Sequence, residues 1–175
     1  SLISWLRNRT GFQKKMIKIT LQGIAIGLAL SMMTLLVLYS TRRDPWDQLP
    51  GKRITGEEIT ERVDDWSFME SSTRVILEVR PSDPYSVYNR AFVHDGILYL
   101  NSITPENRWT QFLLGNPNMR LKVENRIYRV RATRVENPAL VKEIHQAREE
   151  MYPRMLGERP AEERDRNWYF RIDSR

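Results

Sequence analysis

The longest hydrophobic run of the chain lies near its N-terminus, where no charged residue occurs between Ile19 and Thr41. As an α-helix, this stretch would extend roughly 34 Å, enough to cross a hydrocarbon core of about 30 Å with some tilt. The pattern predicts a single transmembrane helix over residues 19–41. A cleaved signal peptide is the alternative, but its apolar core would be shorter, and Tyr39-Ser40-Thr41 lacks the small-x-small pattern of a cleavage site.

Beyond residue 54 the pattern changes to short alternating segments separated by turn signals. Apart from Ile76, residues 74–80 alternate apolar and charged positions, which predicts a half-buried strand. Asp95-Gly96 lies between the apolar runs 91–93 and 97–100, which predicts a β-hairpin. A second hairpin is predicted around Glu124-Asn125, between residues 119–123 and 126–135, and a closing strand at residues 168–172.

Three short helices are also predicted from their N-terminal signals. Thr55-Gly56-Glu57-Glu58 has the spacing of a capping box and would begin a helix reaching Trp66. Thr104-Pro105 and Asn137-Pro138 each pair an N-cap residue with proline at the first helical position. About six short strands with two or three small helices predict a compact, mostly antiparallel barrel.

The chain is thus expected to have four parts. A basic N-terminal segment (1–18) precedes the transmembrane helix (19–41). Residues 42–53 contain two prolines and a glycine, which indicates a linker. Residues 54–175 form the extramembrane domain.

Charge is concentrated at one end of the chain. Residues 1–18 carry five basic residues and no acidic one, whereas the remaining chain is nearly balanced despite an overall isoelectric point near 9.8. A nucleic-acid partner is therefore not expected. Five cationic residues precede the hydrophobic run and four follow it closely, so the positive-inside rule favours a cytoplasmic N-terminus. The C-terminal domain would then be periplasmic, on the outer side of a bacterial inner membrane.

Small residues recur within the hydrophobic run. Gly23, Gly27 and Ser31 are four residues apart and share one helix face. Such a row allows a second helix to approach closely, so it predicts contact with integral membrane protein subunits. The plainer interpretation is that glycine is common in membrane helices.

The remaining chemistry offers little for catalysis. The chain has no cysteine, which excludes disulfides and thiolate metal sites. His94 and His145 lack the spacing of a metal-binding pair, and no nucleophile elbow or phosphate-binding glycine loop is present. We therefore predict no catalytic residue and no metal site.

Residues 92–144 resemble the split-barrel flavin- and deazaflavin-binding superfamily, and are most similar to its deazaflavin-dependent nitroreductase-like branch. The shared pattern comprises the Asp-Gly hairpin, Trp109 at the start of a short helix, an Asn-Pro turn at Asn116, and the strand 128–135 followed by Glu-Asn-Pro. The resemblance implies a split-barrel fold and a phosphate-bearing flavin-type cofactor.

The positions that would approach this cofactor differ from the family pattern. The family carries a Gly-Arg-Lys-Ser-Gly-like segment before the hairpin, whereas residues 80–90 contain no glycine, two prolines and Asp83. Proline removes amide donors, and the aspartate repels phosphate. The expectation is therefore no cofactor. If FMN or deazaflavin is bound instead, the best-placed residues for it are Arg80, Arg90, Asn101, Ser102 and Arg108.

Two functions of different class follow. The first is an accessory subunit whose helix packs into a larger membrane complex, with respiratory and photosynthetic assemblies as analogies. The second is a membrane-tethered flavin- or deazaflavin-dependent oxidoreductase.

Overall fold

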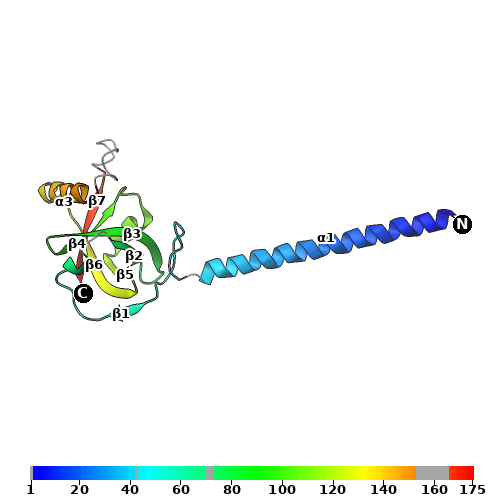
Figure 1. The fold of residues 1–175 in the computed structure, drawn as a ribbon, viewed down its shortest axis with the longest axis horizontal. Helices are drawn as coiled ribbons and strands as arrows, with labels where there is room; N and C mark the ends of the chain where they lie inside the picture. The colour runs from blue at the N-terminus through cyan, green and yellow to red at the C-terminus, as the bar shows by residue number, and fades with distance from the viewer. Residues whose placement is uncertain (1, 42, 70–72, 153–165) are drawn as a thin grey trace. The chain divides into compact units, whose positions relative to one another are not determined.

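The computed structural model describes residues 2–41, 43–69, 73–152 and 166–175. The chain divides into two compact units, residues 1–42 and residues 43–175. The first unit is helix α1 (Leu2–Thr41), drawn in blue in Figure 1. By length and composition, its stretch Lys15–Thr41 could cross a membrane, a criterion that an N-terminal signal sequence also meets. The helix extends well before residue 19, so much of the predicted basic segment is helical too.

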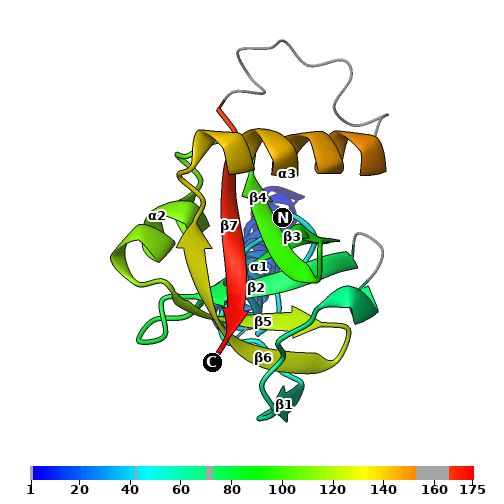
Figure 2. The ribbon, with the colours of Figure 1, turned by 90° about the vertical axis from the view of Figure 1, so that its left-hand side faces the viewer.

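The second unit is built on a barrel of six antiparallel strands, as the alternating pattern predicted. The strands are adjacent in the order β6-β5-β2-β3-β4-β7, and pairing between β6 and β7 closes the barrel. A short seventh strand pairs with β6 in parallel. Figure 2 shows the strands curving around one interior. Their bounds are β1 (Glu57–Ile59), β2 (Thr73–Val79), β3 (Tyr85–His94), β4 (Ile97–Ser102), β5 (Asn118–Val123), β6 (Arg126–Arg134) and β7 (Trp168–Ser174).

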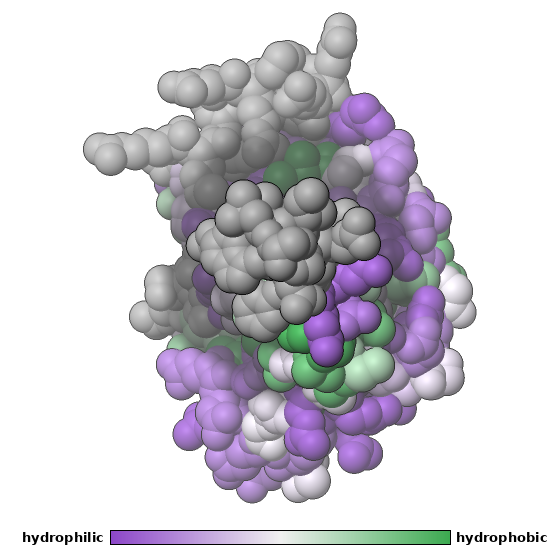
Figure 3. All heavy atoms as spheres, turned by 90° about the vertical axis from the view of Figure 1, so that its right-hand side faces the viewer, coloured by the Kyte–Doolittle hydropathy of each residue, from purple (hydrophilic) through white to green (hydrophobic). Residues whose placement is uncertain are grey.

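Alternate side chains along the strands point into the barrel and fill its interior. Val75, Leu77 and Val79 of β2 are fully buried in the main core. Ile76 points to the other face, where it packs in a small outer cluster with Ile54 and Ile127. On the face drawn in Figure 3, hydrophilic side chains form most of the rim of the 43–175 unit.

Both predicted hairpins are present, because their turn residues can adopt left-handed backbone conformations. Asp95 and Gly96 have φ angles of 51° and 74° between β3 and β4, as a two-residue hairpin turn requires. Glu124 has a φ of 54° between β5 and β6.

Two of the three predicted helices exist. Helix α3 (Pro138–Met151) begins as predicted, with the Asn137 side chain accepting a hydrogen bond from the Ala139 amide (3.0 Å). Helix α2 (Arg108–Gly115) begins later than predicted, because residues 104–107 form a turn before it.

The predicted helix over residues 55–66 is wrong. The segment instead contains β1 and then a loop, with a single 3₁₀ turn, η1 (Ser67–Met69), after it. Thr55 donates both its backbone N–H (2.8 Å) and its hydroxyl (3.4 Å) to Asp44, and Glu58 pairs with Arg120. Both capping-box side chains therefore have distant partners, and these tertiary contacts outweigh the local helix signal.

Residues 43–55, hereafter the entry loop, are folded onto the barrel. The amide of Gly51 donates to the Ser86 carbonyl (2.8 Å), and the Ser86 amide donates to the Gly51 carbonyl (3.1 Å). The Lys52 amide closes the base of the loop by donating to the Arg43 carbonyl (2.7 Å). Asp44 adds an ion pair with Lys122 of β5.

Candidate functional site

A groove with a volume of about 480 Å³ lies where β2, β3, the end of β4 and the start of α2 meet the tip of the entry loop. Its walls combine aromatic rings, amides and two arginines, so it has both flat apolar surfaces and hydrogen-bonding groups. The lining residues are Asp47, Gln48, Leu49, Arg74, Tyr85, Val87, Tyr88, Asn89, Asn101, Ile103, Asn107, Arg108 and Trp109.

The two arginines of the groove stack on its tyrosines. The guanidinium carbon of Arg74 lies 3.7 Å from the ring centre of Tyr88, and that of Arg108 lies 5.3 Å from the ring centre of Tyr85. Such cation–π contacts orient a guanidinium while leaving its edge available for hydrogen bonds. Chemically, the groove suits a planar or anionic group.

The structure brings two of the five predicted cofactor residues, Asn101 and Arg108, into this groove. Asn101 is largely buried, and its amide donates to Asn167 (3.1 Å). Ser102 lies beneath the surface, where its hydroxyl donates to the Thr104 carbonyl (2.7 Å) and accepts from Asn107 (2.8 Å). Its hydroxyl thus holds the turn before α2.

Arg80 and Arg90 lie outside the residues that line the groove. Arg80 has a φ of 59° in the loop between β2 and β3, where its Nε donates to the Asp83 carbonyl (2.9 Å). Its guanidinium also pairs with the Asp83 carboxylate and lies over the ring of Phe112. Arg90 is exposed on β3, opposite Arg74 of β2.

Sequence reasoning missed several groove residues. Arg74 and Asn89 come together with the predicted residues through strand pairing, since β2 and β3 are antiparallel neighbours. The alternating pattern of residues 74–80 does place Arg74 on the polar face of the strand, so the sequence indicated that its side chain is exposed. No sequence pattern predicted that Asp47, Gln48 and Leu49 line the groove, because their position depends on the entry loop folding onto the barrel.

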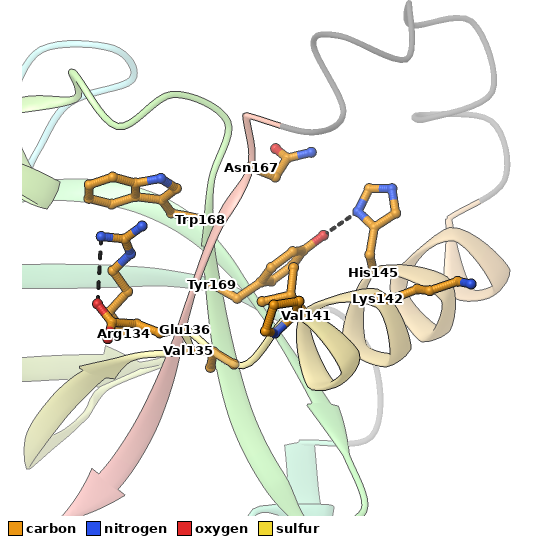
Figure 4. A pocket seen from close by; sticks show the side chains of 10 residues that line it. Arg134, Val135, Glu136, Val141, Lys142, His145, Asn167, Trp168 and Tyr169 are labelled. Atoms are coloured by element: carbon orange, nitrogen blue, oxygen red, sulfur yellow. Dashed lines mark hydrogen bonds and ion pairs between the residues drawn. The ribbon is translucent and has the colours of Figure 1, made fainter.

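A second cavity, of about 550 Å³, lies between α3 and the ends of β6 and β7 (Figure 4). Arg134 stacks on Trp168, with 3.6 Å between the guanidinium carbon and the ring centre, and forms an ion pair with Glu136 (3.8 Å). On the opposite wall, the Tyr169 hydroxyl lies 2.6 Å from Nδ1 of His145. Burial raises the pKa of the Tyr169 phenol.

His94 lies beside two carboxylates. Its Nε2 is 3.0 Å from Glu143 of α3 and 3.8 Å from Asp95. One donor atom from each residue lies within 4.8 Å of the others. Both acids are exposed, and the His94–Glu143 contact is a link between the β3–β4 turn and α3.

No protein-family model matches the chain, and no curated protein sequence matches it. Solved structures do show similarity. A structure described as an F420 reductase is 18% identical, covers 67% of this chain and 96% of its own, and has a TM-score of 0.47. A putative 5-nitroimidazole antibiotic resistance protein from Bacteroides thetaiotaomicron is 13% identical, with coverages of 65% and 82% and a TM-score of 0.47.

An FAD-binding protein from Mesorhizobium loti is 17% identical, with coverages of 62% and 86% and a TM-score of 0.43. Proteins described as acting with F420 or binding FAD are thus among those that the barrel is similar to. Similarity at this level concerns the fold and does not extend to activity or ligand.

Proposed function

We propose that the protein is a membrane-anchored accessory subunit. Helix α1 would pack against integral membrane subunits of a larger complex, and the split barrel would be an interaction domain without a flavin-type cofactor. The observation that carries this proposal is the loop between β2 and β3, because its charged groups are bonded to one another.

In this loop, Arg80 and Asp83 are hydrogen-bonded and ion-paired to each other. The Asp83 amide donates to the Arg80 carbonyl (3.0 Å), and the Arg80 guanidinium is bonded to both the carbonyl and the carboxylate of Asp83. Pro81 and Pro84 offer no amide donors. By the resemblance, this segment would have to hold the cofactor phosphate. A phosphate here would lose several charge-assisted hydrogen bonds of roughly 1.5–3 kcal/mol each, which would weaken binding by orders of magnitude.

The membrane contact of the proposal involves the small-residue face of α1. A Cβ atom added to Gly23 or Gly27 would meet no atom within 4 Å. The Ser31 hydroxyl donates to the Gly27 carbonyl (2.9 Å), so it stays close to the helix surface. This face is therefore flat, and a flat face is what close helix–helix packing in lipid needs. The charge bias implies a cytoplasmic N-terminus and a periplasmic barrel.

Co-purification from native membranes tests the subunit role. Replacing both Gly23 and Gly27 with leucine should release the full-length protein from its membrane partners, because bulky side chains hold the helices apart. The matched control replaces Ala25 and Ala29 with leucine, which places the same leucine side chains with the same spacing on the opposite face. Partners retained by the glycine variant and by the control alike would mean that α1 does not make the contact.

A membrane-tethered flavin- or deazaflavin-dependent oxidoreductase is the second candidate. The groove favours it, since Arg74, Arg108 and Asn101 line a space that suits a planar, anionic ligand. Location would discriminate between the two candidates, because reduced nicotinamide and deazaflavin are cytoplasmic reductants and would not reach a periplasmic barrel.

A further inference from the structure

The tip of the entry loop presents two apolar side chains to solvent. Trp46 is 78% exposed and Leu49 is 48% exposed, although tryptophan is usually well buried. Their backbones exchange hydrogen bonds, from the Trp46 amide to the Leu49 carbonyl (3.1 Å) and from the Leu49 amide to the Trp46 carbonyl (2.8 Å). Residues paired in this way project their side chains to the same side of a hairpin. Trp46 and Leu49 therefore form one apolar tip.

The base that carries this tip is fixed to the barrel. Pro45 and Gly51, on either side of the turn, are buried. A Cβ atom at Gly51 would lie 2.3 Å from the Arg43 carbonyl oxygen and 2.5 Å from the Pro45 nitrogen, so only glycine allows this close approach. Together with the paired bridge to Ser86, this packing presents the tip in a defined conformation.

Chain length limits how far the tip can lie from the end of α1. Trp46 follows Thr41, the last residue of the helix, by five positions. Five residues span at most about 18 Å, so a helix end at a membrane surface keeps Trp46 within reach of the headgroup layer. Tryptophan favours that layer, because its ring is apolar and its N–H can bond to polar groups. Arg43, Lys52 and Arg53 are exposed beside the turn and would be attracted to anionic headgroups.

We propose that the Trp46–Leu49 turn inserts into the lipid interface of the membrane that α1 spans. This inference rests on the proposed membrane anchoring. The turn is a second attachment point, which holds the barrel at the membrane surface. Asp47 and Gln48 occupy the corner of the turn and are exposed, so the insertion stays at headgroup depth.

Spin-label accessibility in vesicles tests this inference. The chain has no cysteine, so a single introduced cysteine can be labelled specifically. The full-length protein is reconstituted at low density into vesicles of phosphatidylcholine and phosphatidylglycerol. The reporter is Leu49→Cys, which retains Trp46. The controls are Leu114→Cys, at an exposed apolar position of α2, and Leu30→Cys within α1.

The label at Leu49 should be several-fold more accessible to oxygen, relative to a water-soluble relaxant, than the label at Leu114. Adding Trp46→Ala should return it towards the aqueous value. A Leu49 label as aqueous as that at Leu114, with the Leu30 label in lipid, overturns the inference alone. A Leu49 label shielded from both relaxants indicates protein contact and also overturns it. An aqueous Leu30 label overturns the membrane anchoring and this inference together.

Discussion

Glu78 is the one acidic side chain fully buried among the residues that the structure describes. Its carboxylate accepts from the Ile54 amide (2.7 Å) and from the Arg120 guanidinium (2.8 and 3.0 Å). Arg120 also pairs with Glu58. Burial alone would lower the pKa of Arg120, but the hydrogen bonds with Glu78 and Glu58 outweigh it and raise this pKa. Glu78 and Arg120 together thus connect the entry loop, β1, β2 and β5.

Replacing Glu78 with alanine should strongly destabilise the barrel, because the Ile54 amide and Arg120 lose a buried acceptor. We expect a loss of about 3 kcal/mol in the free energy of unfolding, measured by urea titration of the full-length protein in detergent. The control is Glu136→Ala, which removes an exposed ion pair with Arg134 and should change stability little. Equal effects of the two substitutions would contradict the role of Glu78.

The raised pKa of Tyr169 predicts that the protein loses stability at alkaline pH. Burial raises its pKa above the ordinary value of 10.0, so the unfolded chain ionises this phenol first as the pH rises. The stability that the neutral phenol contributes is complete below pH 10 and is lost as the pH rises towards the higher folded-state pKa. Tyr169→Phe should flatten the dependence of the unfolding midpoint on pH between 9 and 11. An unchanged slope in the phenylalanine variant would be inconsistent with a raised pKa.

At the scale of elements, the sequence predicted what is local and failed where distant residues decide. The hairpins at Asp95-Gly96 and Glu124, and the start of α3 at Asn137, depend on turn and cap chemistry within a few residues. The capping box at residues 55–58 has equally good local chemistry. It forms no helix, because Asp44 accepts hydrogen bonds from the Thr55 amide and hydroxyl, and Arg120 pairs with Glu58.

The candidate site shows the same difference between features set by local sequence and features set by distant residues. Asn101 and Arg108, two of the residues named from the resemblance, line the groove, and their role in binding a cofactor stays a prediction. Arg80 and Arg90 are ten positions apart, and the prolines between them made regular strand pairing uncertain. β3 nevertheless pairs with β2 from Tyr85 to Ala91, which fixes Arg90 opposite Arg74 and leaves Arg80 in the loop. Strand register and loop contacts of this kind form between segments that are distant in the sequence. No local sequence pattern predicts which of these segments pair.

The entry loop is the element whose attachment is easiest to test. Gly51→Val should detach it, because the side chain would collide with the Arg43 carbonyl and with Pro45. Trypsin should then cleave faster after Lys52 and Arg53, as measured by mass spectrometry of the full-length protein, while the barrel stays resistant. Gly115→Val is the control, since a Cβ atom there meets nothing within 4 Å. Cleavage that is equally fast in both variants would argue against a fixed loop.

At the scale of the whole molecule, a helix long and apolar enough to cross a membrane precedes a barrel whose groove and β2–β3 loop differ in their chemistry. The groove contains arginines and aromatic rings, whereas the loop between β2 and β3 is closed by its own Arg80–Asp83 pair. A phosphate-bearing cofactor needs both a planar site and a phosphate site. We therefore expect the barrel to act through protein and membrane contacts.

The most direct test is titration of the purified full-length protein with FMN and with reduced deazaflavin, followed by absorption and fluorescence. We expect no flavin-like absorption band in the protein as isolated and no saturable binding at micromolar concentration. Arg108→Ala and Arg80→Ala, which change the groove and the loop respectively, should then leave the titration unaltered. Micromolar binding of either cofactor that is lost in one of these variants would contradict the account and favour the oxidoreductase.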